Sequence, residues 1–238
     1  MRILLFLLIF SLHHTIVYSQ VNETNLQEIY NKAEHDYGPD DRLISGKLYF
    51  PLHKLQDEHP FFKSKSFFKA TIYINENIYM NIPLKYDMEQ QKMIIEVSND
   101  NSVEIIEVIP ERINSIVFDN KKFKFSTMIS PLLEDENYYE LFWEEGFIYI
   151  ISRNLIFDPL KNRNEVISGG YKKLTINRYI LTDNKIYTVN SKRSFLNLAK
   201  KKKKEIKKFM KENKIKYNKL SEKSHKSLMQ FCYEKKVF

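Results

Sequence analysis

The chain has little cysteine, glycine or proline, and each shortage limits its architecture. Cys232 is the single cysteine in 238 residues, so no intramolecular disulfide can form and stability has to come from a packed core. Five glycines and seven prolines leave most turns to Asn and Asp, which tolerate left-handed backbone angles. Beyond the N-terminal segment there is no apolar run long enough for a membrane span, so none is predicted in the mature chain.

Sequence signatures of catalysis and nucleotide binding are also missing. The chain contains no G-x-S-x-G, no H-E-x-x-H and no glycine-rich phosphate loop. Cys232 falls on the apolar side of an expected helix, which favours a core position over a nucleophile, because a reactive thiol needs an accessible, electropositive setting. We therefore predict a non-enzymatic protein that uses no cofactor.

The first residues, MRILLFLLIFSLHHTIVYSQ, have the layout of a secretory signal peptide. Arg2 supplies the positive start, residues 3–12 form the apolar region, and Ser19 precedes the expected cleavage before Gln20. Residues 1–19 are thus predicted to direct export to the periplasm or the exterior. Because nucleic acid is scarce there, it is not an expected partner.

Charge is divided unevenly along the chain. Residues 190–238 contain 17 Lys and Arg against 4 Glu, a net charge of +13, whereas residues 21–189 contain 20 Lys and Arg against 26 acidic residues, a net charge of −6. An acidic body with a basic tail suggests either that the tail docks on the body or that it meets an external polyanion.

Residues 20–190 alternate between apolar and polar side chains in short segments separated by turns, which predicts antiparallel β-structure. The fold class is therefore mainly β within α+β, as a curved antiparallel meander or a barrel-like sheet. Residues 153–170 show no clear periodicity and are expected to form a long loop. The predicted strands are Leu43–Phe50, Phe67–Ile74, Ile78–Leu84, Met93–Val97, Val103–Ile109, Ile116–Phe118, Phe123–Phe125, Tyr138–Trp143, Phe147–Ile151, Leu174–Leu181 and Ile186–Val189.

Residues 191–238 are predicted to form two helices that pack on the β domain. Ser194 and Ser221 are the expected N-caps, and Asn213 is expected to end the first helix in a left-handed conformation. An apolar stripe recurs at helical spacing between the lysines and is expected to be buried on the sheet, leaving Lys200–Lys204 mostly exposed. The stripe consists of Phe195, Leu198, Ala199, Ile206, Phe209 and Met210.

Two stretches resemble an uncharacterised family of secreted proteins from Bacteroidota. One is YYELFWEEG at residues 138–146, and the other is KRSFL at residues 192–196, followed by a lysine-rich stretch and KENKIK at residues 211–216. The resemblance implies an exported, β-rich protein with a lysine-rich helical tail. It implies no activity and no site residues.

Candidate contact residues fall into two groups. Trp143, Tyr138 and Tyr139 are aromatic residues in an acidic region, where they could bind a ligand or partner. The exposed lysines are candidates for contact with an anionic surface or an envelope protein. These lysines are Lys200, Lys201, Lys203, Lys204 and Lys207.

The segment HKLQDEH contains the densest mix of metal-ligand types, with His53, Asp57 and His59 as the candidates. Its spacing matches no zinc signature, and it lies between two prolines, so a solvated loop is the favoured interpretation and no metal is predicted.

The sequence thus favours an exported, non-enzymatic protein of the cell envelope with a binding or structural role. One alternative is a periplasmic carrier that holds an apolar ligand on a curved sheet. Another is a glycosidase-like hydrolase using Glu140, Glu144 or Glu145, since such enzymes pair two carboxyl groups beside aromatic faces.

Overall fold

The computed structural model describes Glu28, Lys32 and residues 40–53, 58–99, 102–161, 169–182 and 184–238. The chain divides into two compact units, Met1–Pro39 and Asp40–Phe238, and the fold below is that of the second unit. The expected signal peptide of residues 1–19, with cleavage before Gln20, lies outside the described residues.

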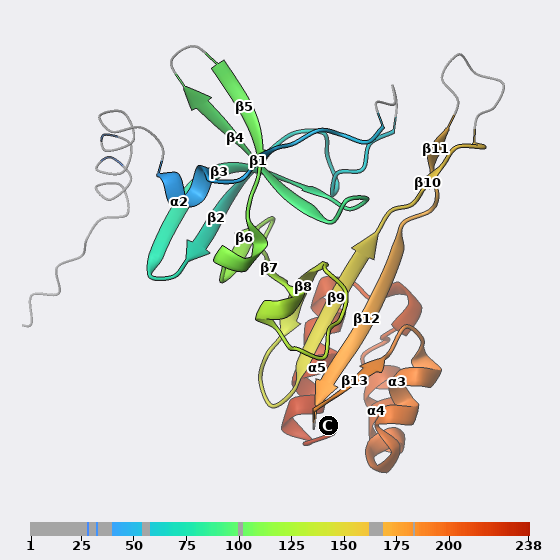
Figure 1. Cartoon of the computed structure of the whole chain (residues 1–238). Helices are drawn as coiled ribbons and strands as arrows, with labels where there is room; N and C mark the ends of the chain where they lie inside the picture. The colour runs from blue at the N-terminus through green and yellow to red at the C-terminus, as the bar shows by residue number, and fades with distance from the viewer. Residues whose placement is uncertain are drawn as a thin grey trace, which may run out of the picture. The chain divides into compact units, whose positions relative to one another are not determined.

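The second unit is built on an antiparallel sheet of 11 strands, in the order β1-β5-β4-β3-β2-β6-β7-β8-β9-β12-β13 (Figure 1). Because β1 and β13 are its two edges, the sheet is open, which decides between the two predicted forms. A separate two-stranded ribbon pairs β10 with β11. The strands are β1 Lys47–Leu48, β2 Phe68–Ile74, β3 Asn77–Asp87, β4 Lys92–Asn99, β5 Ser102–Glu107, β6 Ser115–Phe118, β7 Lys121–Phe125, β8 Tyr138–Trp143, β9 Ile148–Asn154, β10 Phe157–Asp158, β11 Gly170–Tyr171, β12 Thr175–Thr182 and β13 Lys185–Thr188.

The meander has two rearrangements: β1 pairs with β5 instead of β2, and β6 pairs with β2 instead of β5. After β5 the chain passes through the 3₁₀ turn η1 (Pro110–Arg112) and returns to place β6 on the free side of β2. From β6 onward the strands that follow one another in sequence pair antiparallel as far as β9, then β12 and β13. The short turns between these strands leave no room for crossover helices, which is why no parallel pairing occurs among the described strands.

The turns rely on Asn and Asp, as the shortage of glycine predicted. Asp119 and Asn120 both have positive φ (50° and 56°), the pair of angles that a two-residue hairpin turn between β6 and β7 requires. Asn75 and Asn184 occupy the same region in the β2–β3 and β12–β13 turns, and Gly146 (φ 74°) does so between β8 and β9. Asn and Asp thus supply the left-handed positions of these hairpin turns, while the β3–β4 turn uses Gln91 (φ 56°).

Two predicted segments differ from the structure. The segment Leu43–Phe50 was expected to be one strand, but Asp41–Ile44 forms the short helix α2, capped by the Asp40 side chain, and only Lys47–Leu48 pairs in the sheet. Residues 153–170 were expected to be a loop, yet β9 continues to Asn154 and β10 then pairs with β11. Two-residue strands are too short to show an alternating pattern, so the sequence could not indicate them.

The C-terminal segment is helical, as predicted, but it forms three α-helices where two were expected, and their boundaries differ. Ser191, not Ser194, is the N-cap of α3 (Lys192–Leu198); the two serines form a reciprocal capping box, with Ser194 at the third helical position. A 3₁₀ turn, η3 (Lys200–Lys202), separates α3 from α4 (Lys203–Glu212). Lys214, not Asn213, carries the positive φ after α4. Ser221 caps α5 (Glu222–Glu234), as predicted, after the 3₁₀ turn η4 (Tyr217–Lys219).

The apolar stripe of these helices is buried against the sheet. Phe195, Ala199, Ile206 and Met210 are at most 2% exposed, and Leu198 and Phe209 are half-buried. They share one hydrophobic cluster with strand residues, which confirms that the stripe belongs to the core. The cluster members from the strands and the residues next to them are Phe147, Tyr149, Ile151, Ile180 and Val189. Within the described part of the chain, no helix has the length and apolarity needed to cross a bilayer.

We expect Ser191→Ala to lower the free energy of unfolding by about 1 kcal/mol, because the Ser194 N–H loses its acceptor, the Ser191 hydroxyl. Urea denaturation measures this change. Asn197→Ala is the matched control: its side chain is exposed in the same helix, and alanine favours the helix, so stability should stay equal or rise slightly. An equal loss in both variants would contradict the capping role of Ser191.

Candidate functional site: the basic face of the C-terminal helices

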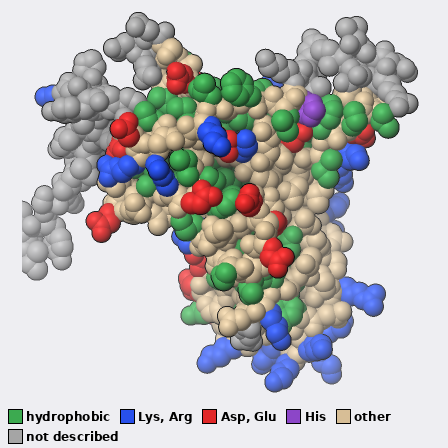
Figure 2. Space-filling view, viewed as in Figure 1, with side chains coloured by type: hydrophobic (Ala, Val, Ile, Leu, Met, Phe, Trp, Pro, Cys, Tyr) green, Lys and Arg blue, Asp and Glu red, His purple; other side chains and the backbone are tan. Residues whose placement is uncertain are grey.

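The helices α3 and α4 turn their lysines away from the sheet. With 3.6 residues per turn, the burial of Ile206 and Met210 on one side of α4 leaves the lysines of the other sides in solvent. Lys200, Lys201 and Lys204 are exposed and Lys202 and Lys203 are half-buried, in line with the expectation for Lys200–Lys204. Lys and Arg side chains gather over these helices at the lower end of Figure 2. We call the face formed by Lys200, Lys201, Lys203, Lys204, Lys207 and Lys211 the basic face.

Little negative charge opposes the basic face. In the described segment 192–219, the ion pairs are Lys202–Glu205 (3.2 Å) and Lys208–Glu212 (3.9 Å), both between neighbouring turns. None of the six lysines of the basic face forms an ion pair with a described residue. The positive potential of this face is therefore largely uncompensated by the protein itself.

The acidic residues of the body do not dock on this face, contrary to one expectation from the charge distribution. Glu144 is bound instead by Lys122 (2.9 Å) and Lys124 (3.5 Å) of β7. Among the described residues, the single ion pair between the helices and the strands has the opposite polarity, with Glu222 of α5 bound to Lys121 of β7 at 3.3 Å. Apolar packing, rather than attraction between oppositely charged surfaces, thus holds the helices on the sheet.

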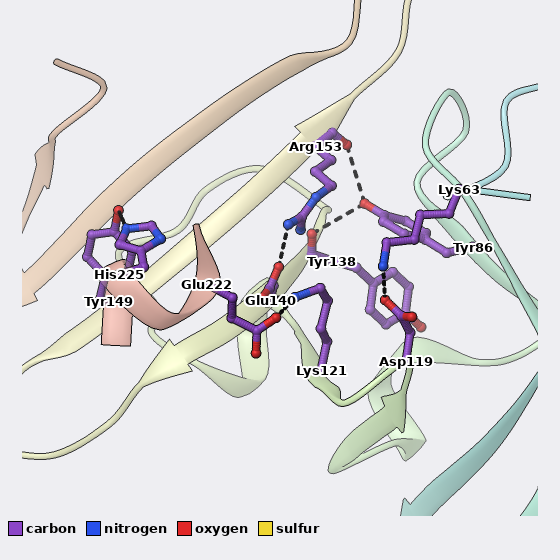
Figure 3. A network of polar contacts seen from close by, with 10 residues as sticks. All are labelled: Lys63, Tyr86, Asp119, Lys121, Tyr138, Glu140, Tyr149, Arg153, Glu222 and His225. Atoms are coloured by element: carbon purple, nitrogen blue, oxygen red, sulfur yellow. Dashed lines mark hydrogen bonds and ion pairs between the residues drawn. The ribbon is translucent and has the colours of Figure 1, made fainter. Parts of the chain in front are cut away.

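A buried ionic network lies under the start of α5 (Figure 3). Glu140 of β8 projects from the same sheet face as Phe123 of β7, beside it in the register. Its carboxylate binds the Lys121 Nζ at 3.1 Å and the Arg153 guanidinium of β9. The three side chains are 4%, 12% and 11% exposed, so two cations depend on one buried anion. Lys121 extends the network to Glu222 and so connects the strands with α5.

A second buried polar contact joins α5 to the sheet. His225 Nε2 and the Tyr149 hydroxyl of β9 share a hydrogen bond of 2.7 Å, and the imidazole packs against the Phe142 ring at 4.5 Å between centroids. Burial lowers the pKa of His225 to about 3, and the positive charges of Arg178 and Lys121 add to this effect. His225 is therefore neutral at physiological pH, as a core histidine with one hydrogen-bond partner should be.

The aromatic candidates occupy different environments from those expected. Tyr138 and Tyr139 are each 1% exposed, on opposite faces of β8, so their side chains are inaccessible to a partner. Strand alternation points one into the face that carries Glu140 and the other into the cluster with Leu133. Trp143 is half-buried, and its Nε1–H donates to the Glu145 carbonyl at 2.8 Å. Of the three, Trp143 alone retains an accessible surface.

The metal candidates do not converge. The His53 ring stacks on Phe157 (3.5 Å between centroids) and lies 3.3 Å from the Glu89 carboxylate, whereas His59 Nδ1 accepts the Phe61 N–H at 3.2 Å. Asp57 lies outside the described residues. In the described ranges, no three His, Cys, Asp or Glu side chains are grouped to hold a metal ion.

The carboxylates of the hydrolase alternative are separated by their partners. Glycoside hydrolysis requires two carboxyl groups that face each other across the scissile bond. Glu140 is buried with Lys121 and Arg153, while Glu144 is bound at the surface by two lysines of β7. This arrangement gives the hydrolase alternative no geometric support.

A cavity of about 480 Å³ lies beside the end of α5, where the β8–β9 turn meets the C-terminal residues. Gly146, Phe147, Cys232, Tyr233 and Phe238 are among its lining residues. Phe147 and Cys232 also belong to the buried cluster between sheet and helices, so the cavity lies at the edge of that cluster. The carrier alternative expects a deep cavity inside the cluster, where the side chains are packed against one another.

Comparison of the chain with protein-family models, with curated proteins and with solved structures found no match.

The ionic network and the His225–Tyr149 contact were not predicted from the sequence. The sequence did contain one signal. Lys121 lies on the same strand face as Phe123 and Phe125, and Glu140 lies on the same face as Tyr138, so both charged residues occupy positions that point inward. Charged residues at inward strand positions indicate a buried ion pair, since an unpaired buried charge is too costly to persist.

Proposed function

We propose that this protein is an exported, non-enzymatic component of the cell envelope that binds an anionic lipid surface through its basic face. The signal-peptide layout of residues 1–19 supports export, either to the periplasm or beyond it. The observation that carries the binding proposal is the set of exposed lysines that have no acidic partner in the described part of the chain.

The burial of the apolar stripe limits the kind of membrane contact that α4 can make. Because Ile206 and Met210 are buried in the core, α4 has no free apolar side with which to enter a bilayer as an amphipathic helix. The contact offered by this segment is therefore electrostatic. Each lysine held near an anionic membrane surface contributes about 1 kcal/mol, so several in one face give measurable binding.

The test compares two triple variants with equal loss of charge. Replacing Lys201, Lys204 and Lys207 with glutamine is expected to weaken binding to vesicles of phosphatidylcholine and phosphatidylglycerol by roughly 100-fold, from about 1 kcal/mol per lysine. Co-sedimentation of the full chain with the vesicles measures the partition coefficient.

The control triple replaces Lys63, Lys69 and Lys185, which are exposed on the body, with glutamine. This variant should bind within a few-fold of the wild type. Equal weakening by both triples would show that net charge, rather than the basic face, determines binding, and would contradict the proposal. Because the substituted lysines are exposed, and the ion pair of Lys63 with Asp119 lies at the surface, both variants should keep the free energy of unfolding of the wild type to within about 1 kcal/mol.

A further inference from the structure

A second surface suited to a lipid bilayer begins in the extended segment at residues 47–53. Successive side chains of this segment point to opposite sides, but here the apolar ones face solvent, whereas in a core strand they face the protein. The Tyr49 hydroxyl donates to Asp87 Oδ2 at 2.6 Å, and His53 stacks on Phe157, so both face the protein. Leu48, Phe50 and Leu52 alternate with them and are 54%, 72% and 63% exposed.

The ribbon of β10 and β11 adds two more exposed apolar side chains at the same place. Ile156 and Leu160 are 55% and 59% exposed on either side of Phe157, the residue on which His53 stacks. Hydrophobic side chains gather beside a histidine over this region, toward the upper right of Figure 2. We call Leu48, Phe50, Leu52, Ile156 and Leu160 the apolar arm surface.

The His53–Phe157 stack joins residues 47–53 to the ribbon, and Glu58 and Glu89, which lie outside both segments, hold the ribbon in place. The Lys161 Nζ donates to Glu58 Oε1 at 2.5 Å, and the other Glu58 oxygen accepts the Tyr171 N–H at 2.5 Å. The Tyr171 hydroxyl donates to Glu89, which also lies 3.3 Å from His53. The polar groups between the segments are thus satisfied by each other, and the apolar side chains are presented outward from a fixed backbone.

The charges around this surface favour anionic lipid as its occupant. The nearby carboxylates of Glu58 and Glu89 are engaged as described, and Asp158 accepts the Leu160 N–H at 3.0 Å. Lys172 and Lys173 are exposed and form no ion pair with a described residue, and the Lys172 N–H donates to the Ile156 carbonyl, which places Lys172 beside the apolar side chains. Apolar side chains flanked by unpaired lysines complement the acyl region and the phosphate layer of a membrane.

Contiguous exposed apolar side chains mark interaction surfaces, because leaving them in water forgoes about 25 cal/mol for each Å² that could be buried. We propose that the apolar arm surface inserts into the interfacial layer of an anionic bilayer. This inference rests on the membrane binding proposed above and adds a second, apolar contact to it.

A single tryptophan placed on the surface tests the insertion. In a Trp143→Phe background, Phe50→Trp becomes the sole tryptophan, and Val103→Trp is the matched control, because Val103 is 63% exposed on β5 outside the arm surface. With anionic vesicles, the emission of the Phe50→Trp protein should shift to the blue and be quenched by lipids brominated on the acyl chain. The Val103→Trp protein should show neither change.

An affinity measurement accompanies the spectroscopy. Phe50→Asp is expected to weaken vesicle binding by about 10-fold, through loss of one inserted aromatic side chain, while Val103→Asp leaves it unchanged. Both sites are exposed, so the urea midpoint of either variant should match that of the wild type.

The outcomes separate this inference from the function on which it rests. Vesicle binding that depends on the basic-face lysines, but without quenching at position 50, would overturn the insertion and leave the proposed function standing. Quenching at position 50 that persists in the basic-face triple variant would support insertion while contradicting the role of the lysines. If position 50 is shielded only on mixing with a protein partner, insertion is likewise overturned.

Discussion

Replacing Glu140 with glutamine is expected to lower the free energy of unfolding by about 3–5 kcal/mol, the largest effect predicted for a single substitution in this chain. Glu140 is 4% exposed on its side chain and is the shared counter-ion of Lys121 and Arg153. Glutamine keeps the size and shape but removes the charge. Lys121 then keeps only Glu222, which lies toward solvent, and Arg153 has no ion-pair partner left among the described residues. Urea denaturation followed by far-UV circular dichroism measures the change.

Glu144→Gln is the matched control for that experiment. Glu144 also binds two lysines, Lys122 and Lys124, but it is 44% exposed, where water screens the interaction. Its replacement should change the free energy of unfolding by less than about 1 kcal/mol. Adding Lys121→Met to Glu140→Gln should recover part of the lost free energy of unfolding, because it removes one of the two cations that Glu140 no longer neutralises. Equal effects at Glu140 and Glu144 would contradict the buried network.

Mild acid is expected to destabilise the protein through His225. Its pKa is lowered to about 3 in the folded chain, mainly by burial, whereas the ordinary value is 6.5. Between these values the unfolded chain binds a proton that the folded chain excludes, so the free energy of unfolding falls as the pH is lowered through this window. Above the window both states are neutral and the contribution is constant. The expected loss between about pH 7.5 and about pH 5 is about 2 kcal/mol.

The comparison of His225→Gln with wild type isolates that contribution. Glutamine cannot take up a proton, so the slope of stability against pH between about pH 7.5 and about pH 5 should largely disappear. His59→Gln is the control, since burial also lowers the pKa of His59 but its ring lies nearer the surface and its replacement should leave most of the slope. Carboxylates titrate below this range and do not confuse the result. A slope that is unchanged in His225→Gln would show that His225 is not a buried neutral group.

If both predictions hold, α5 is held on the sheet by buried polar contacts as well as by apolar packing. Glu222 and His225 are one helical turn apart, and each reaches a different strand, through Lys121 of β7 and Tyr149 of β9. Because α5 also contributes Leu228, Met229 and Cys232 to the core, it is fixed along much of its length. The helices therefore present the basic face from a rigid support rather than as a disordered tail.

The strands could be predicted from the sequence where alternation extends over several residues. Tyr138–Trp143 was predicted with its observed bounds, and the expectation that Asn and Asp form most turns is met at Asp119-Asn120. The burial of the helical stripe followed from apolar residues at a spacing of three and four. In each case a local pattern is sufficient, because the side-chain period is set by the backbone geometry of the element itself.

The ionic network and the arm surface could not be predicted, because they depend on which strands become neighbours in the fold. Lys121, Glu140 and Arg153 are far apart in sequence, and they meet because β7, β8 and β9 pair in one register. The same limit explains the arm: the outward direction of Phe50 follows from the inward contacts of Tyr49 and His53, whose partners lie on other strands. Ser194 was predicted as the cap because both members of a capping box are serines, and the sequence does not show which of them precedes the helix.

The most direct test of the account is the salt dependence of wild-type binding to anionic vesicles. The basic face acts through exposed charges, whose interactions are screened within about 10 Å at 0.1 M salt. Raising the salt from about 0.05 M to about 0.5 M is expected to lower the partition coefficient at least about 10-fold, with little binding to phosphatidylcholine vesicles at either concentration. Binding that is equal at both salt concentrations, or equal on anionic and zwitterionic vesicles, would contradict a membrane-binding role for the basic face.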